Sequence, residues 1–201
     1  MSADLLRNSL EIVYDHANTY LGNIDDRGEA WIILSNLAGH DGGVNIAARD
    51  KIVMSVCGIA RETSANTGGT AFPSGTAAAR REPIAIVAPP LYLEVRLMFL
   101  ANFVERAYGD GLSALSRLIA CFQQTPVLTH GTTPLLSPAL DRLTLDFDTL
   151  GPADLAHVMS MHGARYLPSV FYRLRLLPFV SSAMRERGYP VRTTGAAASL
   201  V

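Results

Sequence analysis

Apolar and polar residues alternate along several short stretches of the chain, and each alternation predicts a β-strand. In the clearest stretch every odd position is apolar: Leu91, Leu93, Val95, Leu97 and Phe99. Side chains of a strand point to opposite faces with a period of two, so these five residues would share one buried face. Residues 143–147 and 171–176 repeat the pattern, and residues 31–34 and 51–59 read as two further strands.

Three other segments carry apolar residues at the spacing of an α-helix. The first covers residues 5–20 and would end at Gly22, and the second covers residues 112–122. The third begins at Pro152 and would end at Gly163. Because helices and strands are interleaved, we expect an α+β domain with a mostly antiparallel sheet and helices packed on it.

Two segments lack any such pattern. Residues 64–82 are rich in Gly, Ser, Ala and Thr, and a loop of this length within a domain is either functional or mobile. The sequence therefore predicts one domain over residues 1–180 that contains a mobile loop at 64–82. Residues 181–201, which end in TTGAAASLV, are expected to form a frayed C-terminal tail.

The composition restricts the class of partner. Of 201 residues, 49% are hydrophobic and 17% are charged, below the roughly 25% charged residues of an average globular protein. This fits either a surface that contacts other proteins or simply a large core. The net charge of −1 argues against nucleic-acid binding. All basic residues except Lys51 are arginine, which suits protein interfaces but also follows from genome base composition.

The cellular compartment is indicated by three weaker features. Cys57 and Cys121 lie in apolar segments and are expected to be reduced core residues. The chain has no run of about 18 apolar residues, so no direct membrane insertion is expected. Its first residues, MSADLLRNSLEI, do not resemble a signal peptide. We therefore expect the protein to be cytoplasmic while it is assembled.

No arrangement of residues typical of catalysis or metal binding stands out. The chain lacks a G-x-S-x-G motif and a phosphate-binding Gly-Lys-Ser/Thr loop. His157 and His162 are five residues apart, which turns them roughly 140° from each other on a helix, unlike a zinc-binding pair. The stretch His40-Asp41-Gly42-Gly43 is explained by a turn. We expect no catalytic residue, no cofactor and no metal.

Charged residues nevertheless alternate on two of the predicted strands. Asp146 and Asp148 share one strand face, and Arg173 and Arg175 share a face with Phe171. The acids fit either paired carboxylates or a solvated face, and the arginines could pair with them across the sheet. Together with Tyr166 and Pro168, which precede their strand, Arg173 and Arg175 are candidates for a subunit interface. Solvated arginines explain the same pattern.

Four blocks of the sequence resemble a known family when they are taken together. They cover residues 5–37, 88–103, 108–130 and 140–177, and include Pro-Pro-Leu-Tyr-Leu, Phe-Gln-Gln-Thr-Pro-Val, Arg-Leu-Thr-Leu and Tyr-Leu-Pro-Ser-Val. Their order and spacing are similar to those of the cap, or tail-terminator, proteins of phage-tail-like contractile injection systems of the virulence-cassette and antifeeding-prophage type.

The resemblance implies a structural role without enzymatic activity. Such a cap would form a ring, expected to be a hexamer, at the end of tube and sheath distal to the baseplate, and would stop their polymerisation there. Its fold would be similar to that of phage tail terminators, with sheet edges that meet neighbouring subunits. Its partners would be other copies of itself and the tube and sheath subunits. An assembly adaptor elsewhere in such a particle, or a small soluble enzyme, are the alternatives.

Overall fold

The structure is a computed structural model of the whole chain, and its elements belong to two compact units. It describes residues 4–39, 43, 45–62, 72–73, 84–87, 91–138, 140–161, 166–179 and 184–188. The first unit comprises residues 1–65 and 92–178, and the second comprises residues 66–91 and 179–201.

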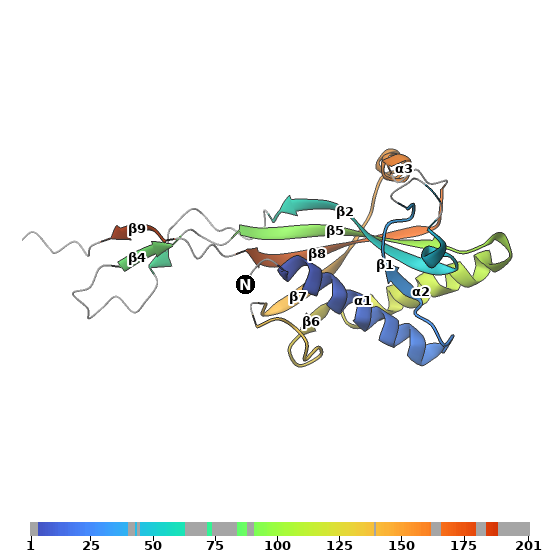
Figure 1. Cartoon of the computed structure of the whole chain (residues 1–201), viewed down its shortest axis with the longest axis horizontal. Helices are drawn as coiled ribbons and strands as arrows, with labels where there is room; N and C mark the ends of the chain where they lie inside the picture. Colours follow the sequence, from blue (N-terminus) through green and yellow to red (C-terminus); the bar gives the residue numbers. More distant parts are fainter. Residues whose placement is uncertain are drawn as a thin grey trace, which may run out of the picture. The chain divides into compact units, whose positions relative to one another are not determined.

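The first unit is built on a six-stranded sheet with helices on both faces (Figure 1). Its strands lie in the order β1-β2-β5-β8-β7-β6; β1 is parallel to β2, whereas the pairs β2–β5, β6–β7 and β7–β8 are antiparallel. The strands are β1 (Ile32–Leu34), β2 (Lys51–Arg61), β5 (Leu91–Asn102), β6 (Val127–Thr129), β7 (Arg142–Asp148) and β8 (Ser169–Phe179). The helices are α1 (Leu5–Ile24), α2 (Tyr108–Gln124) and α3 (Pro152–Met161), with 3₁₀ turns η1 (Ile46–Ala48) and η2 (Glu105–Ala107).

The predicted fold class is confirmed, and the predicted elements lie close to their expected positions. Helix α1 continues past Gly22 to Ile24, because a glycine costs a helix only about 1 kcal/mol and the preceding Leu21 is fully buried. Helix α2 begins at Tyr108 rather than after Gly111. None of the helices in the described part of the chain is long and apolar enough to span a membrane.

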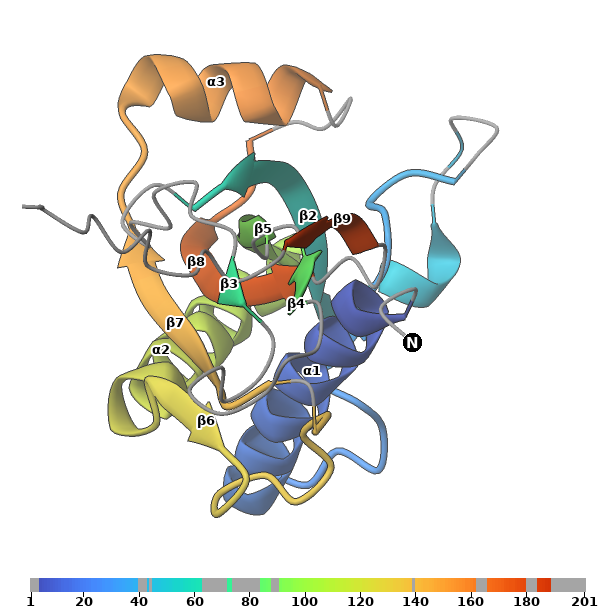
Figure 2. The ribbon, with the colours of Figure 1, turned by 90° about the vertical axis from the view of Figure 1, so that its left-hand side faces the viewer.

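Helices α1 and α2 cover one face of the sheet, and α3 lies on the other face (Figures 1 and 2). On the α1/α2 side, the rings of Phe99, Phe122 and Tyr172 pack with centroids 4.9–5.9 Å apart. The Phe147 ring packs against the Tyr172 ring with centroids 5.4 Å apart, although 53% of Phe147 is exposed. The alternation that predicted β5 is correct on this face for Val95, Leu97 and Phe99, which are fully buried, whereas Leu91 is 43% exposed.

The opposite face is also apolar where α3 covers it, which the alternation did not predict. A second buried cluster joins residues of η1, β2, β5, α3 and β8: Ala48, Val53, Met98, Leu100, Met159 and Phe171. Phe171 thus lies on the same face as Arg173 and Arg175, as expected from its position, but beneath α3. Beyond this cluster the same face carries charged residues.

The second unit contains a three-stranded antiparallel sheet in the order β3-β4-β9. Its strands are β3 (Phe72–Pro73), β4 (Ile84–Val87) and β9 (Met184–Gly188). Sequence patterns predicted neither β3, within 64–82, nor β9, within 181–201. All other residues of these two segments lie outside the described residues, so their mobility stays a prediction.

Candidate subunit interface

Of the four residues predicted for an interface, Tyr166 and Pro168 precede β8 and Arg173 and Arg175 lie within it, and the structure gives them different roles. Tyr166 is 68% exposed. The Pro168 carbonyl accepts a hydrogen bond from the Ala101 N–H at 2.9 Å, which fixes the beginning of β8 against the end of β5. Tyr166 is therefore available to a partner, whereas Pro168 acts through the backbone.

Arg173 and Arg175 do pair with the two aspartates across the sheet. Strands β7 and β8 are aligned so that Asp146 lies opposite Arg173 and Asp148 lies opposite Phe171. Arg173 forms an ion pair with Asp148, and Arg175 forms one with Asp146. Cross-strand pairs of opposite charge stabilise a sheet, so these residues contribute to the subunit's own fold.

Arg175 is fully engaged within the subunit. Its Nε and Nη2 donate to the two Glu62 carboxylate oxygens at 2.8 and 3.0 Å, and its Nη1 donates to Asp146 Oδ2 at 2.9 Å. These hydrogen bonds, first those to Glu62 and then that to Asp146, raise the pKa of Arg175 above its ordinary value. The Glu62 side chain is only 2% exposed. Arg175 thus ties β8 to the residue that follows β2.

Arg173 is less completely bonded and has a second arginine beside the same carboxylate. Its Nε lies 3.5 Å from Asp148 Oδ1, while Arg96 Nε on β5 lies 2.8 Å from Asp148 Oδ2. Asp148 is 11% exposed, whereas Arg96 and Arg173 are 44% and 38% exposed. Sequence reasoning missed Arg96, although its even position on β5 opposes the apolar face.

Both edges of the sheet are partly occupied by side chains of the same chain. On β1, the Ile32 N–H donates to Asn18 Oδ1 at 2.9 Å and the Ile32 carbonyl accepts from Asn18 Nδ2 at 3.3 Å. On β6, the Thr129 N–H donates to Thr132 Oγ1 at 2.9 Å. These bonds protect the edges against strand addition. The expectation that the edges meet neighbouring subunits stays a prediction.

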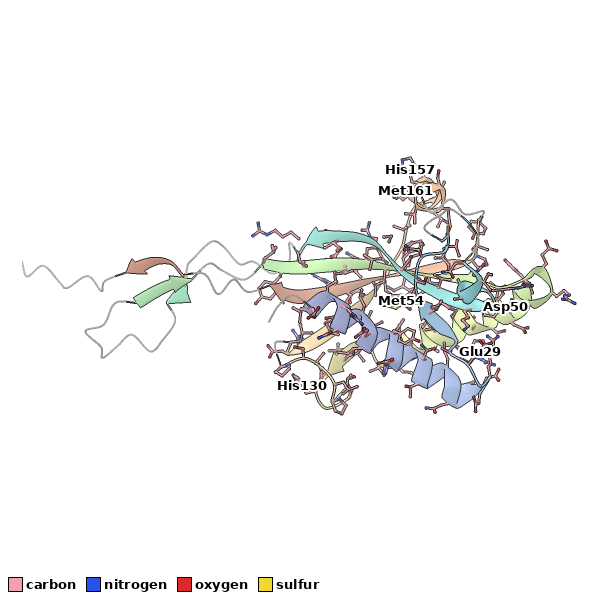
Figure 3. The ribbon with its side chains drawn as sticks, viewed as in Figure 1. Glu29, Asp50, Met54, His130, His157 and Met161 are labelled. Carbon is pink, nitrogen blue, oxygen red and sulfur yellow. The ribbon has the colours of Figure 1, made fainter. Side chains whose placement is uncertain are left out.

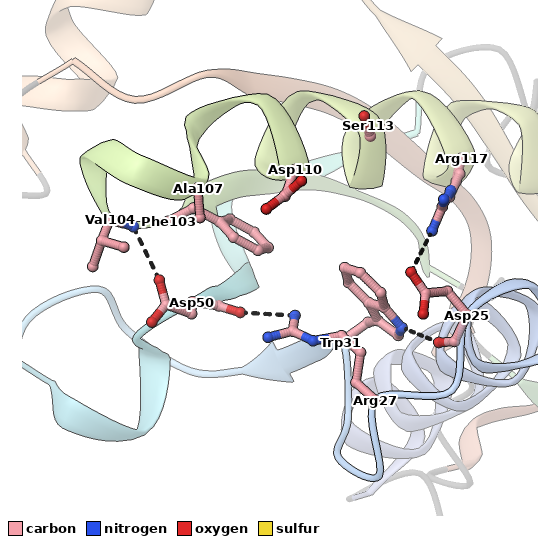
Figure 4. A pocket seen from close by; sticks show the side chains of 10 residues that line it. All are labelled: Asp25, Arg27, Trp31, Asp50, Phe103, Val104, Ala107, Asp110, Ser113 and Arg117. Carbon is pink, nitrogen blue, oxygen red and sulfur yellow. Dashed lines mark hydrogen bonds and ion pairs between the residues drawn. The ribbon is translucent and has the colours of Figure 1, made fainter.

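A cavity of about 440 Å³ lies where the end of α1 meets the beginning of α2 (Figure 4). The Arg27 guanidinium stacks 4.4 Å from the Trp31 ring centroid and donates to the Asp50 carbonyl at 3.0 Å. The Trp31 indole N–H donates to the Asp25 carbonyl at 2.8 Å, and Arg117 pairs with the Asp25 carboxylate. Most polar groups here are thus bonded to one another, which fits packing between the two helices.

The histidines that the structure describes are not brought together as a metal site. His157 lies on α3 and His130 in the loop after β6, on opposite sides of the sheet (Figure 3). Within the described residues, no group of three or more His, Cys, Asp or Glu side chains is placed to hold a metal ion. His162 and His40–Gly42 lie outside the described residues, so the predicted turn at His40–Gly43 is not tested.

Two solved structures have the same fold as this chain. One is the sheath/tube terminator of the PVC extracellular contractile injection system in its extended state, with a TM-score of 0.63 and 10% identity over 96% of this chain. The other is the tube-terminating cap of the anti-feeding prophage, with a TM-score of 0.57 and 10% identity over 100% of this chain. The chain spans 63% and 62% of the lengths of these two proteins. The fold is therefore that of a terminator of contractile injection systems.

Residues 30–193 match the family model described as the Pvc16 N-terminal domain. The chain belongs to this family, and the resemblance found in its sequence motifs is confirmed. No curated protein matches the chain significantly.

Proposed function

We propose that this protein is the cap of a contractile injection particle and ends the polymerisation of tube and sheath at the end distal to the baseplate. The observation that carries the proposal is its family membership together with a fold that matches a sheath/tube terminator over 96% of this chain. In this role the chain works through binding surfaces and carries out no reaction.

A cap must bind a growing end without offering the next ring a surface of the same kind. Stacked rings repeat one head-to-tail contact, which continues until a subunit binds that cannot accept another ring. The cap would therefore have one surface for tube and sheath, a different free surface, and side contacts that close its own ring. We expect a hexamer that is assembled in the cytoplasm and remains part of the finished particle.

The charged strand face supports a role for part of this sheet in contacts between subunits. Arg173 and Tyr166 are accessible, whereas Arg175 is used within the subunit. Side chains occupy part of both sheet edges, so we expect subunits to meet through side-chain surfaces rather than by extending the sheet.

The test is the length distribution of particles in a strain that lacks the gene and in the same strain complemented with it. Negative-stain microscopy should show abnormal or scattered lengths, or sheaths that contract early or disassemble, when the cap is absent. Complementation should restore the original distribution. Equal lengths and equally intact sheaths in both strains would show that the protein does not terminate the tail.

A further inference from the structure

The two units of the chain carry net charges of opposite sign. The second unit, residues 66–91 and 179–201, contains five arginines and two glutamates, which gives a net charge of +3. The first unit contains the other twelve basic and sixteen acidic residues, which gives a net charge of −4. Because complementary charges guide and orient protein association, the second unit of one molecule matches the first unit of another.

The small sheet of the second unit lacks a layer that would cover it. Strand β4 is a run of four apolar residues, Ile84–Val87, which is typical of a strand buried on both faces. Within its described residues the unit consists of β3, β4 and β9 and contains no helix. Cys57 and Cys121 both lie in the first unit, so no disulfide closes the second. Units below roughly 70 residues usually need a disulfide, a metal or a partner subunit, and we therefore expect another molecule to cover this sheet.

The first unit has a groove with matching chemistry. The groove, of about 520 Å³, lies between α1 and residues 134–138. Most of its lining residues are apolar: Ile12, Pro134, Leu135, Leu136 and Pro138. Leu135 is 80% exposed. Glu11 and Asp15 also line the groove, whereas none of the described arginines and lysines does. Glu11 pairs with the exposed Arg7, and Asp15 forms no ion pair with a described residue, so this surface is apolar with a negative excess.

We propose that the second unit of one subunit docks on this groove of the neighbouring copy, and that this contact closes the ring. The apolar residues of β4 would be covered by Leu135 and the prolines, and Glu11 and Asp15 would balance the positive charge of the second unit. A second copy is the occupant because one chain supplies both halves, and a ring closes when two different patches of the same chain meet head to tail. This inference rests on the proposed function, since it takes the cap to be a ring.

The test mixes two charge-reversed full chains and follows their association by sedimentation velocity over a range of concentrations. One chain carries Arg185→Glu/Arg187→Glu in β9, and the other carries Glu11→Lys/Asp15→Lys in the groove. Each variant alone should associate at least about 10-fold more weakly than the wild type, because like charges meet at the contact. An equimolar mixture should regain the association, because the reversed unit of one chain then meets the reversed groove of the other.

Matched controls reverse two charges elsewhere in the first unit. Arg106→Glu/Arg142→Glu and Glu105→Lys/Asp154→Lys change exposed residues that form no ion pair with a described residue and lie outside the groove. Both should associate like the wild type. The neutral variant Arg185→Gln/Arg187→Gln covers the case in which the reversed β9 does not fold. It should weaken the association and reduce its salt dependence, because fewer charges remain to be screened.

Three results would overturn the proposal. They are unchanged association of the neutral and groove variants, a mixture that associates no better than its separate components, and a wild-type chain that stays monomeric at every concentration. Particle lengths test the cap separately, because length control that persists in these variants contradicts this contact and not the cap function.

Discussion

Replacing Arg175 by glutamine tests the conclusion that this arginine holds the subunit together rather than binding a partner. The substitution removes three charge-assisted hydrogen bonds and leaves the Glu62 carboxylate, which is 2% exposed, without its bidentate partner. Breaking a buried ion pair from one side costs about 3–5 kcal/mol. Because 27% of Arg175 and 39% of Asp146 are exposed, water compensates part of this loss, and we expect a cost of about 2–3 kcal/mol.

The loss can be measured by urea and thermal unfolding of purified protein. For a domain of this size, each kcal/mol lowers the melting temperature by about 2–4 °C, so Arg175→Gln should melt roughly 4–12 °C earlier. The double variant Glu62→Gln/Arg175→Gln should regain much of the loss, because it removes the buried negative charge of Glu62 together with its bidentate cation. Arg142→Gln should stay within about 0.5 kcal/mol of the wild type. An Arg175→Gln protein as stable as that control would refute the reasoning.

Three further predictions concern packing, an edge and pH. A Cβ at Gly111 would lie 2.9 Å from the Phe103 ring, so Gly111→Ala should destabilise by about 1–3 kcal/mol in urea unfolding, whereas Gly109→Ala, with nothing within 4 Å, should not. Asn18→Ala should cost about 1–2 kcal/mol and increase aggregation in light scattering, because it frees an edge of the sheet. Burial lowers the pKa of His16 below its ordinary 6.5, so protonation favours the unfolded state; the unfolding free energy should fall as pH drops below 6.5, and less so in His16→Gln.

Because Arg175 pairs with carboxylates of its own subunit, replacing it by glutamate would test folding stability rather than contacts between subunits. A glutamate at this position would stand beside both Glu62 and Asp146, so the first effect would be on folding. Arg173 and Arg96 are the better positions for testing contacts between subunits, because both are partly exposed and share one acceptor.

The sequence by itself determined the type and approximate position of the main elements, and the family. Period-two alternation identified β5, β7 and β8, and it placed Asp146, Asp148, Arg173 and Arg175 on strand faces where they do pair. These properties are local, because side-chain direction along a strand follows from backbone geometry alone. The family was also identified from the sequence alone, because the order and spacing of the motifs can be read without a structure.

Tertiary structure alone decided which distant residues meet. Glu62 contacts Arg175 although 113 positions separate them, and Arg96 reaches Asp148 because β5, β8 and β7 lie side by side. Helix α3 buries Phe171 on the face that it shares with Arg173 and Arg175, and β4 pairs with a β9 that no pattern predicted. Strand order and helix placement depend on the packing of the whole chain, since any strand of suitable pattern can pair with several others. The alternation places Arg173 and Arg175 on the same strand face and cannot distinguish them. Only the tertiary contacts show that Arg175 is bonded within the subunit, whereas Arg173 is partly exposed.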